Sequence, residues 1–257
     1  MGMARFPAVF FGHGSPMNAL EDNVYTQAWA ALGAHIPRPR AILAISAHWY
    51  VDGTRVTAMD RPPTIHDFGG FPRPLQEFLY PAPGDPAFAA ELVQSLAPMA
   101  VSADERWGLD HGTWSVLTHV YPHADVPVVQ LSMNANEPAA FHYELGRRLA
   151  RWRDDDVLLV ASGNVVHNLP VMFGRPPADD WAGRFEQRVR ALARDFDVQP
   201  LIDFDELGPD AARSIPTPEH FLPLLYILGA RQADDAITFP TAGIIAGALS
   251  MLSVRVG

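Results

Sequence analysis

Three histidines follow apolar segments that have the character of buried β-strands. The segments are residues 8–12, 41–47 and 157–166, and they are followed by His13, His48 and His167. In an open, mostly parallel α/β sheet, the carboxyl ends of the strands line one crevice, so residues far apart in the chain meet there. Imidazole is a common ligand of zinc and of non-haem iron. The three positions together predict a metal site at one edge of a sheet.

Each of these histidines also has a plainer interpretation, as a hydrogen-bonded packing residue at a strand end. The small neighbours favour the metal interpretation, because Gly12 and Gly14 flank His13 and Gly163 precedes His167. Glycine lets the backbone approach a ligand closely. We therefore expect at least two of the three histidines to share one metal.

Composition limits the remaining possibilities. The chain has 257 residues, of which 48% are hydrophobic and 19% charged, as in a globular protein, and we expect one domain spanning residues 1–257. The formal net charge of −10 argues against a nucleic-acid partner, which would require clustered Lys and Arg. The chain contains no cysteine, so any metal ligands are nitrogen or oxygen atoms of His, Asp or Glu.

Hydropathy predicts no membrane partner. The longest apolar candidate, residues 242–254, is broken by glycines and serines and is shorter than the roughly 18 residues of a membrane span. The N-terminus lacks a signal-peptide pattern. We therefore expect a cytoplasmic protein, either a monomer or a small homo-oligomer.

Strand and helix patterns alternate along the chain. Strands are expected at residues 8–12, 41–47, 55–59, 126–133, 157–162 and 236–239, with one more within 244–256. Helices are expected at about 23–33, 86–96, 113–120, 138–152, 181–195 and 218–228. This βαβ alternation predicts a three-layer α/β/α domain, with helices on both faces of a mostly parallel sheet.

A proline-rich segment, residues 61–83, has the features of a lid or binding loop. Within it, His66, Asp67 and Phe71 are candidate substrate-binding residues, since the loop can close over a flat molecule. The alternative is that its aromatic rings only fasten the loop to the core.

A second polar cluster, residues 107–114, precedes an expected helix. Asp110 and Thr113 can cap that helix, but capping does not explain His111, which we interpret as a residue that contacts the substrate or supports the metal site. Trp114, on the same helix, is expected to help shape the substrate pocket.

Glu219 and His220 are adjacent in a segment whose prolines mark a helix start. Neighbouring residues on a helix point about 100° apart, so only one of them would face the site. A site of two histidines and one carboxylate would use Glu219, and a three-histidine site would use His220. We favour His220, with Glu219 as the alternative.

The remaining histidines receive plainer interpretations. His119 and His123 lie near the end of an expected helix, where a turn with polar contacts is favoured over a second metal site, and His35 and His142 are expected on the surface. Ser15 and Ser162 lack the Gly-x-Ser-x-Gly elbow, so serine hydrolysis is not expected.

Taken in order, five motifs closely resemble the DOPA-4,5-dioxygenase-like branch of the class III extradiol ring-cleavage dioxygenases. They are Gly12-His13-Gly14-Ser15-Pro16, Ser46-Ala47-His48-Trp49, Asp110-His111-Gly112-Thr113-Trp114, His167-Asn168-Leu169 and Pro218-Glu219-His220-Phe221-Leu222-Pro223-Leu224. The resemblance runs from about residue 7 to residue 254. It implies an α/β domain related to the catalytic subunit of protocatechuate 4,5-dioxygenase, with a catechol and O2 as substrates.

The resemblance also implies the roles of the histidines. His13, His48 and His220 would bind one divalent metal, which is Fe(II) for dioxygenase activity or Zn(II) as a bound or resting ion. His167 would be a fourth ligand in a resting zinc form, or an acid-base residue beside iron. By the same analogy, His111 would steady or protonate developing charge on bound oxygen.

Two other functions remain open from the sequence. An all-histidine site suits zinc at least as well as iron, and zinc has no redox chemistry. A zinc-dependent hydrolase of a small amide or ester would use Glu219 or His167 as its base. The third possibility is a non-catalytic protein that keeps the fold to bind a small ligand.

Overall fold

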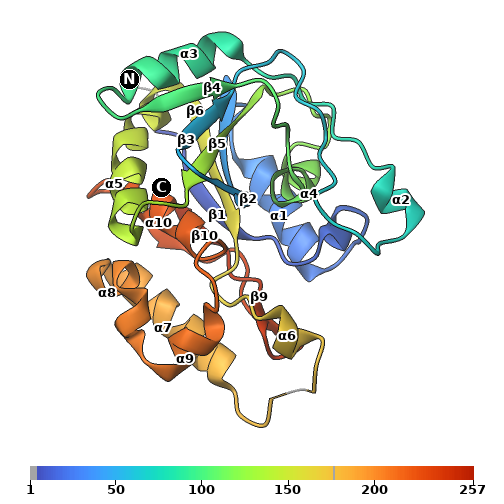
Figure 1. Cartoon of the computed structure of the whole chain (residues 1–257), viewed down its shortest axis with the longest axis vertical. Coiled ribbons are helices and arrows are strands. Elements are labelled where there is room, and N and C mark those ends of the chain that lie inside the picture. Colours follow the sequence, from blue (N-terminus) through green and yellow to red (C-terminus); the bar gives the residue numbers. More distant parts are fainter. Residues whose placement is uncertain (1–4, 176) are drawn as a thin grey trace.

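The computed structural model describes residues 5–175 and 177–257 and is built on one eight-stranded sheet (Figure 1). Its four central strands run parallel to one another; they are β1 (Ala8–Gly12), β2 (Ala41–Val51), β5 (Val128–Asn134) and β6 (Val157–Gly163). Nearly all of their side chains are buried, and the exceptions lie mainly at the carboxyl end of β2. Continuous apolar strands of this kind are expected where helices cover both faces.

Short strands complete the sheet on either side, in the order β4-β3-β5-β2-β6-β1-β10-β7. On one side, β3 (Thr54–Thr57) runs antiparallel to β5, and β4 (Val101–Asp104) runs parallel to β3. On the other side, β10 (Val254–Val256) pairs antiparallel with β1, and β7 (Ile237–Thr238) pairs antiparallel with β10. The sheet is therefore mostly parallel at its centre and mixed at its margins.

Helices cover both faces of the sheet, as the alternating pattern predicted (Figure 1). One face packs against α1 (Val24–His35) and α4 (His111–Val120), where Ile42 of β2 joins a core cluster with Trp29 and Leu117. The next residue of β2, Leu43, points to the opposite face and joins a cluster with Leu145. That face carries α3 (Pro86–Ser95), α5 (Ala139–Leu149) and α10 (Leu222–Gly229).

A further group of elements extends the molecule beyond α10, in the lower half of Figure 1. It contains α7 (Trp181–Asp195), α8 (Gln199–Ile202) and α9 (Pro209–Ser214), which pack on one another with a 3-10 turn at Phe204–Leu207. Nearby are α6 (Leu169–Met172) and a two-stranded ribbon of β8 (Ile244–Ile245) and β9 (Leu249–Ser250). Further 3-10 turns lie at Pro16–Ala19 and Ala150–Asp155, and α2 (Arg73–Gln76) lies within the long loop.

Among the differences from the expected elements, three concern the sheet and the segment that carries His220. Segment 244–256 forms three short strands rather than one, because the backbone turns at Ala246 and Gly247, which have positive φ angles of 48° and 69°. The helix expected from residue 218 begins at Leu222, after an irregular turn. Strand β4 was not expected from the sequence, because it lies at the sheet edge and lacks the apolar run of a central strand.

No helix in the described residues combines the length and the apolar character that crossing a lipid bilayer requires.

Candidate active site

A cavity of about 610 Å³ opens at the carboxyl ends of the central strands. Its polar wall is formed by five histidines and one carboxylate, namely His13, His48, His111, His167, His220 and Asp67. These residues come from six separate segments of the chain, and the parallel sheet brings them to one edge.

His13 directly follows β1, and its backbone N–H donates to the carbonyl of Gly163 at the end of β6 (3.1 Å). Its Nδ1 lies 2.9 Å from the hydroxyl of Ser162, which in turn donates to the carbonyl of Gly112 (2.5 Å). A hydroxyl has a single proton to donate, so Ser162 accepts the Nδ1 proton of His13. This arrangement leaves Nε2 of the neutral His13 ring with a free lone pair.

His48 lies within β2 rather than beyond its end, because the strand continues to Val51. Its pairing with β5 shifts register between Ile45 and Tyr50, and His48 occupies this irregular stretch. Its Nδ1 contacts Oδ2 of Asp67 at 3.1 Å. The two Nε2 atoms of His13 and His48 lie 3.3 Å apart.

His220 is held in the turn before α10, where the backbone of β6 packs closely against it. A Cβ atom on Gly163 would lie 2.2 Å from the His220 carbonyl oxygen, so this contact requires glycine. Nδ1 of His220 contacts Oε1 of Glu219 at 3.1 Å, and its ring stacks on His167 with 3.5 Å between centroids. The expectation that only one of residues 219 and 220 reaches the site assumed a helix; in this turn, both approach His167.

The donor set has the chemistry of a metal site. His13, His48 and His220 each place one ring nitrogen within 4.8 Å of the others. In each ring Nδ1 has an acceptor, which is Ser162, Asp67 or Glu219, so Nε2 is the atom that remains for a metal. Three neutral imidazole nitrogens suit zinc or ferrous iron.

Burial and mutual repulsion keep two of these rings neutral. Burial, together with the neighbouring histidines, lowers the pKa of His13 and of His220 well below the usual value. Burial also acts to lower the pKa of His48, but Asp67 and Asp110 raise it overall. The set therefore combines two rings that are ready to bind a cation with a third that is polarised by carboxylates.

Asp67 links this set to His111 at the start of α4. Its Oδ1 accepts from the backbone N–H of His111 (3.1 Å) and lies 2.9 Å from Nδ1 of the same residue. Burial acts to raise the pKa of Asp67, but the hydrogen bonds from His111 and His48 hold it well below its usual range. The carboxylate is thus an anion between two imidazoles, and its oxygens are already engaged.

His167 lies on the far side of His220. Its backbone N–H donates to Ser214 (2.9 Å), and it forms an isolated bridge with Leu249 of β9. Burial lowers the pKa of His167 to about 4, so the ring is neutral at pH 7. A neutral imidazole beside the donor set can accept a proton from a bound ligand.

A buried polar network, which the sequence reasoning missed, supports the N-terminus of α4. Asp110 caps this helix at Thr113 N (3.2 Å), as predicted, and also accepts from Ser46 of β2 (2.6 Å) and from Gln130 of β5. The sequence feature that could have indicated this network is a single polar residue within an otherwise apolar strand, as at Ser46 and Gln130, because buried polar groups need hydrogen-bond partners.

His66 and Trp114 do not line the cavity. Trp114 is fully buried, donates from Nε1 to the carbonyl of Ile65 (2.9 Å) and stacks on Phe78. His66 Nε2 contacts the carbonyl of Phe78 at 2.9 Å. Both residues contact backbone carbonyls of loop 61–83 and lie behind the wall of the cavity.

The same loop does supply Phe68 and Phe71 to the cavity, where their rings meet edge to face. Loop 61–83 is therefore both fastened to the core and part of the wall. Another part of the wall is apolar and lies on and beside α6 and β9. The sequence did not predict that these residues line the cavity; they are Leu169, Met172, Phe173 and Leu249.

Two other histidines have structural contacts. His142 was expected on the surface but is fully buried, with Nδ1 2.9 Å from the hydroxyl of Tyr226, because α5 packs on α10. His119 contacts the carbonyl of Asn18 (2.7 Å), whose side chain donates to the carbonyl of His13 (2.8 Å). His119 therefore supports the turn that carries His13.

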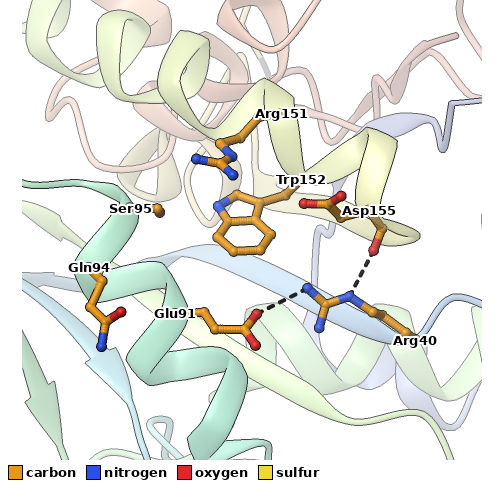
Figure 2. A pocket seen from close by; sticks show the side chains of 7 residues that line it. All are labelled: Arg40, Glu91, Gln94, Ser95, Arg151, Trp152 and Asp155. Carbon is orange, nitrogen blue, oxygen red and sulfur yellow. Dashed lines mark hydrogen bonds and ion pairs between the residues drawn. The ribbon is translucent and has the colours of Figure 1, made fainter.

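A second hollow, shown in Figure 2, lies near the amino ends of β2 and β6. It is lined by charged groups that already contact one another, since Arg40 donates to Glu91 (3.4 Å) and to the carbonyl of Asp155 (2.8 Å). Arg40 and Arg151 also lie over the ring of Trp152. The hollow brings together none of the histidines described above.

Comparison with known proteins agrees with this geometry. Residues 8–247 match the family described as the catalytic LigB subunit of aromatic ring-opening dioxygenase. The chain is 53% identical to the Escherichia coli protein named 4,5-DOPA dioxygenase extradiol, covering all of this chain and 97% of that protein. A Beta vulgaris protein of the same name is 36% identical, over 86% of this chain and 85% of its own. The crystal structure of an uncharacterized Escherichia coli K12 protein has a TM-score of 0.85 at 48% identity, over 98% of this chain and all of the other.

Proposed function

Because the chain belongs to the LigB family of aromatic ring-opening dioxygenases, and is an extradiol ring-cleaving enzyme, we propose that it opens a DOPA-like catechol at one divalent metal held by His13, His48 and His220. The relatives' names supply the substrate class. The observation that carries the proposal is the convergence of three imidazoles, each with Nδ1 held by an acceptor and Nε2 left free.

The contact between Nε2 of His13 and Nε2 of His48 supports a shared cation. The two atoms are 3.3 Å apart, and in neutral rings both carry a lone pair because both Nδ1 atoms donate elsewhere. Two lone pairs at this distance repel unless a positive charge lies against both. When it is bound, a ferrous ion would supply open positions at which a catechol and dioxygen are held side by side.

We assign proton transfer and the stabilisation of charge to the two remaining histidines of the cavity. His167 is neutral at pH 7, because burial lowers its pKa to about 4, and we assign it the proton that a catechol hydroxyl loses on binding. His111 has Nδ1 on Asp67, which leaves Nε2 for the cavity, where it would stabilise charge that develops on the substrate oxygens. Phe68 and Phe71 would pack on the flat ring and exclude water.

The proposal also includes the identity of the native metal. Three imidazoles suit zinc as well as iron, but only iron can take part in dioxygen chemistry. We propose Fe(II) as the active ion and Zn(II) as a resting or substitute ion. We also propose that residues 1–257 form one catalytic domain that works in the cytoplasm, as a monomer or small homo-oligomer and without a nucleic-acid partner.

Oxygen uptake tests the reaction directly. Metal-free protein would be reloaded anaerobically with Fe(II), and a second sample with Zn(II); each would then receive L-DOPA or a simpler catechol in an oxygen electrode. We expect uptake and a new visible absorbance in the iron sample alone. If no catechol consumes oxygen with the iron sample, the proposed reaction is rejected, and a zinc-dependent hydrolase or binding protein becomes the better explanation.

Two variants separate metal binding from proton transfer. In His13→Ala, the loss of one of three ligands should abolish stoichiometric metal binding, while the circular dichroism spectrum stays unchanged. In His111→Ala, the metal content should stay near one per chain while turnover is lost. A full metal complement in His13→Ala would show that His13 is not a ligand.

A further inference from the structure

Asp110 carries a buried charge that the capping of α4 does not by itself require. Asparagine and serine cap helices about as well as aspartate does. Asp110 is nevertheless fully buried, where a carboxylate is unfavourable unless other groups compensate its charge. We propose that the carboxylate of Asp110 is a counter-charge for the metal dication, acting from behind His48 in addition to capping α4. This inference rests on the metal site of the proposed function and assigns a second carboxylate to it.

The hydrogen bonds of Asp110 identify it as an ionised carboxylate. Its Oδ1 accepts from the hydroxyl of Ser46 (2.6 Å) and from the backbone N–H of Thr113 (3.2 Å), and its Oδ2 accepts from Nε2 of Gln130. The Ser46 hydroxyl itself accepts from the backbone N–H of His48 (3.2 Å), so its own proton goes to Asp110. Since these contacts place donors on both oxygens, they leave no acceptor for a carboxyl proton.

The partners of Asp110 among the described residues are all neutral. They are a hydroxyl, an amide and a backbone N–H. The buried carboxylate of Asp235, by contrast, is paired with the guanidinium of Arg153. The negative charge of Asp110 is therefore held by dipoles alone, and a cation bound nearby would compensate it further.

Close packing at Gly112 brings this carboxylate near the metal-binding side of His48. A Cβ atom on Gly112 would lie 2.5 Å from Oγ of Ser46, 2.9 Å from Cδ2 of His48 and 3.3 Å from Oδ1 of Asp110. These three atoms thus surround one small space that glycine leaves free. Cδ2 is bonded to Nε2, the nitrogen that remains for a metal, so a bound dication would lie close to the carboxylate. Such an attraction is strong in a buried site, where water and salt screen it little.

Two variants remove the charge and keep the cap. Asp110→Asn has nearly the same shape, and the amide of Gln130 can turn to present its oxygen to the new NH2 group. Asp110→Ser also retains a capping oxygen and provides a second test if the asparagine variant does not fold. The affinity of each variant would be measured for Zn(II) and, under anaerobic conditions, for Cu(I), by competition with a chelator.

The two ions should respond differently because they differ in charge. We expect the affinity for Zn(II) to fall by about 10- to 100-fold, the usual effect of losing a group that supports metal ligands. The attraction to a monovalent ion is half as large, so the affinity for Cu(I) should fall by only about three- to tenfold.

Asp85→Asn is the matched control. Asp85 caps α3 by accepting from the backbone N–H of Phe88 (2.9 Å), and α3 packs on the face of the sheet opposite to α4. The substitution changes the net charge by the same amount but should leave both affinities at their wild-type values. An equal loss of Zn(II) affinity in Asp85→Asn and Asp110→Asn would assign the effect to net charge and overturn the proposal.

The comparison of ions separates charge from geometry. If Asp110 only caps α4, both of its variants will bind Zn(II) as tightly as the wild type does. If it only holds His48 in place, the affinities for the two ions will fall by the same factor. Either result overturns the proposal. The absence of oxygen uptake with every catechol would reject the proposed reaction but not this inference, because these measurements need no turnover, whereas full metal content in His13→Ala would reject both.

Discussion

At the scale of single residues, one carboxylate organises two histidines that belong to different elements. Asp67 was expected to contact the substrate, and it does line the cavity, but its oxygens contact Nδ1 of His48 and both Nδ1 and the backbone N–H of His111. These contacts fix which nitrogen of each ring carries the proton. Asp67 is therefore a positioning residue for both rings.

Replacing this carboxylate should weaken metal binding without unfolding the chain. The amide of Asp67→Asn has one acceptor oxygen in place of two, so one of the two imidazoles loses its partner. We expect metal affinity to fall on the order of 10- to 100-fold, the usual effect of losing a partner of a metal-bound histidine. Competition with a chelator measures this affinity.

A matched control lies on the same loop. Glu77→Gln removes an exposed carboxylate whose ion-pair partner among the described residues is Arg73, and metal affinity should stay at the wild-type value. Wild-type metal affinity in Asp67→Asn would show that the observed contacts do not position His48.

At the scale of elements, the irregular stretch of β2 and the close packing of α5 on α10 are the features that local sequence patterns do not reveal. Pairing between β2 and β5 is broken between Ile45 and Tyr50, and this irregular stretch contains His48. On the other face of the sheet, His142 of α5 is enclosed against Tyr226 of α10. Burial lowers the pKa of His142 to about 4.

This buried histidine should make stability depend on pH. The unfolded chain binds a proton at His142 below about pH 6.5, whereas the folded chain binds it only near pH 4, so between these values the unfolded state holds more protons and stability falls as pH decreases. From pH 7 to pH 5 the loss from this residue is about 2 kcal/mol.

Urea unfolding of the wild type and His142→Asn at pH 7, 6 and 5 measures this contribution. The asparagine keeps a polar group near Tyr226 but does not titrate. The wild type should therefore lose more stability than the variant as the pH falls, while other titrating groups cancel in the difference. If the free energy of unfolding changes equally with pH in the wild type and in His142→Asn, then His142 does not cause the predicted pH dependence.

At the scale of the whole molecule, the two edges of the sheet have different roles. The carboxyl edge carries the cavity, while the amino edge carries a buried ion pair that joins the segment before β1 to strand β10. Arg153 is fully buried and pairs with Asp235 (2.6 Å), and it also donates to the carbonyls of Phe6 (2.7 Å), Ala230 (2.7 Å) and Val256 (3.4 Å). One guanidinium thus joins the start of β1, the end of α10 and strand β10.

Removing this guanidinium should destabilise the fold while leaving the site intact. Arg153→Met takes the buried cation away from Asp235, which keeps only its contacts with Gln232 N–H and the more exposed Arg5, and removes a donor from three carbonyls. We expect a loss of about 3–5 kcal/mol in the free energy of unfolding. The exposed control Arg147→Gln breaks only a surface pair with Glu144 and should change stability by less than about 1 kcal/mol. Urea unfolding measures both. The folded fraction of Arg153→Met should still bind metal with wild-type affinity. If the variant instead loses metal affinity but keeps its stability, then Arg153 supports the metal site rather than the fold.

Residue types and their order along the chain are enough to predict the class of fold and the chemistry of the ligands. Continuous apolar strands such as those at 8–12 and 157–163 lie in the core because they can bury both faces, and their alternation with helical segments leads to a mostly parallel sheet. The absence of cysteine restricts metal ligands to nitrogen and oxygen, and histidines after apolar strands indicate the edge where they meet.

The use of each side chain, by contrast, depends on tertiary contacts. The sequence did not distinguish Trp114, buried behind the wall, from Phe71, which lines the cavity, and it placed His142 on the surface. The proton of each imidazole depends on an acceptor supplied from elsewhere, such as Ser162 for His13 and Asp67 for His48. The physical reason is that such contacts form between segments distant in the chain, so they depend on how the elements pack and not on local periodicity or spacing.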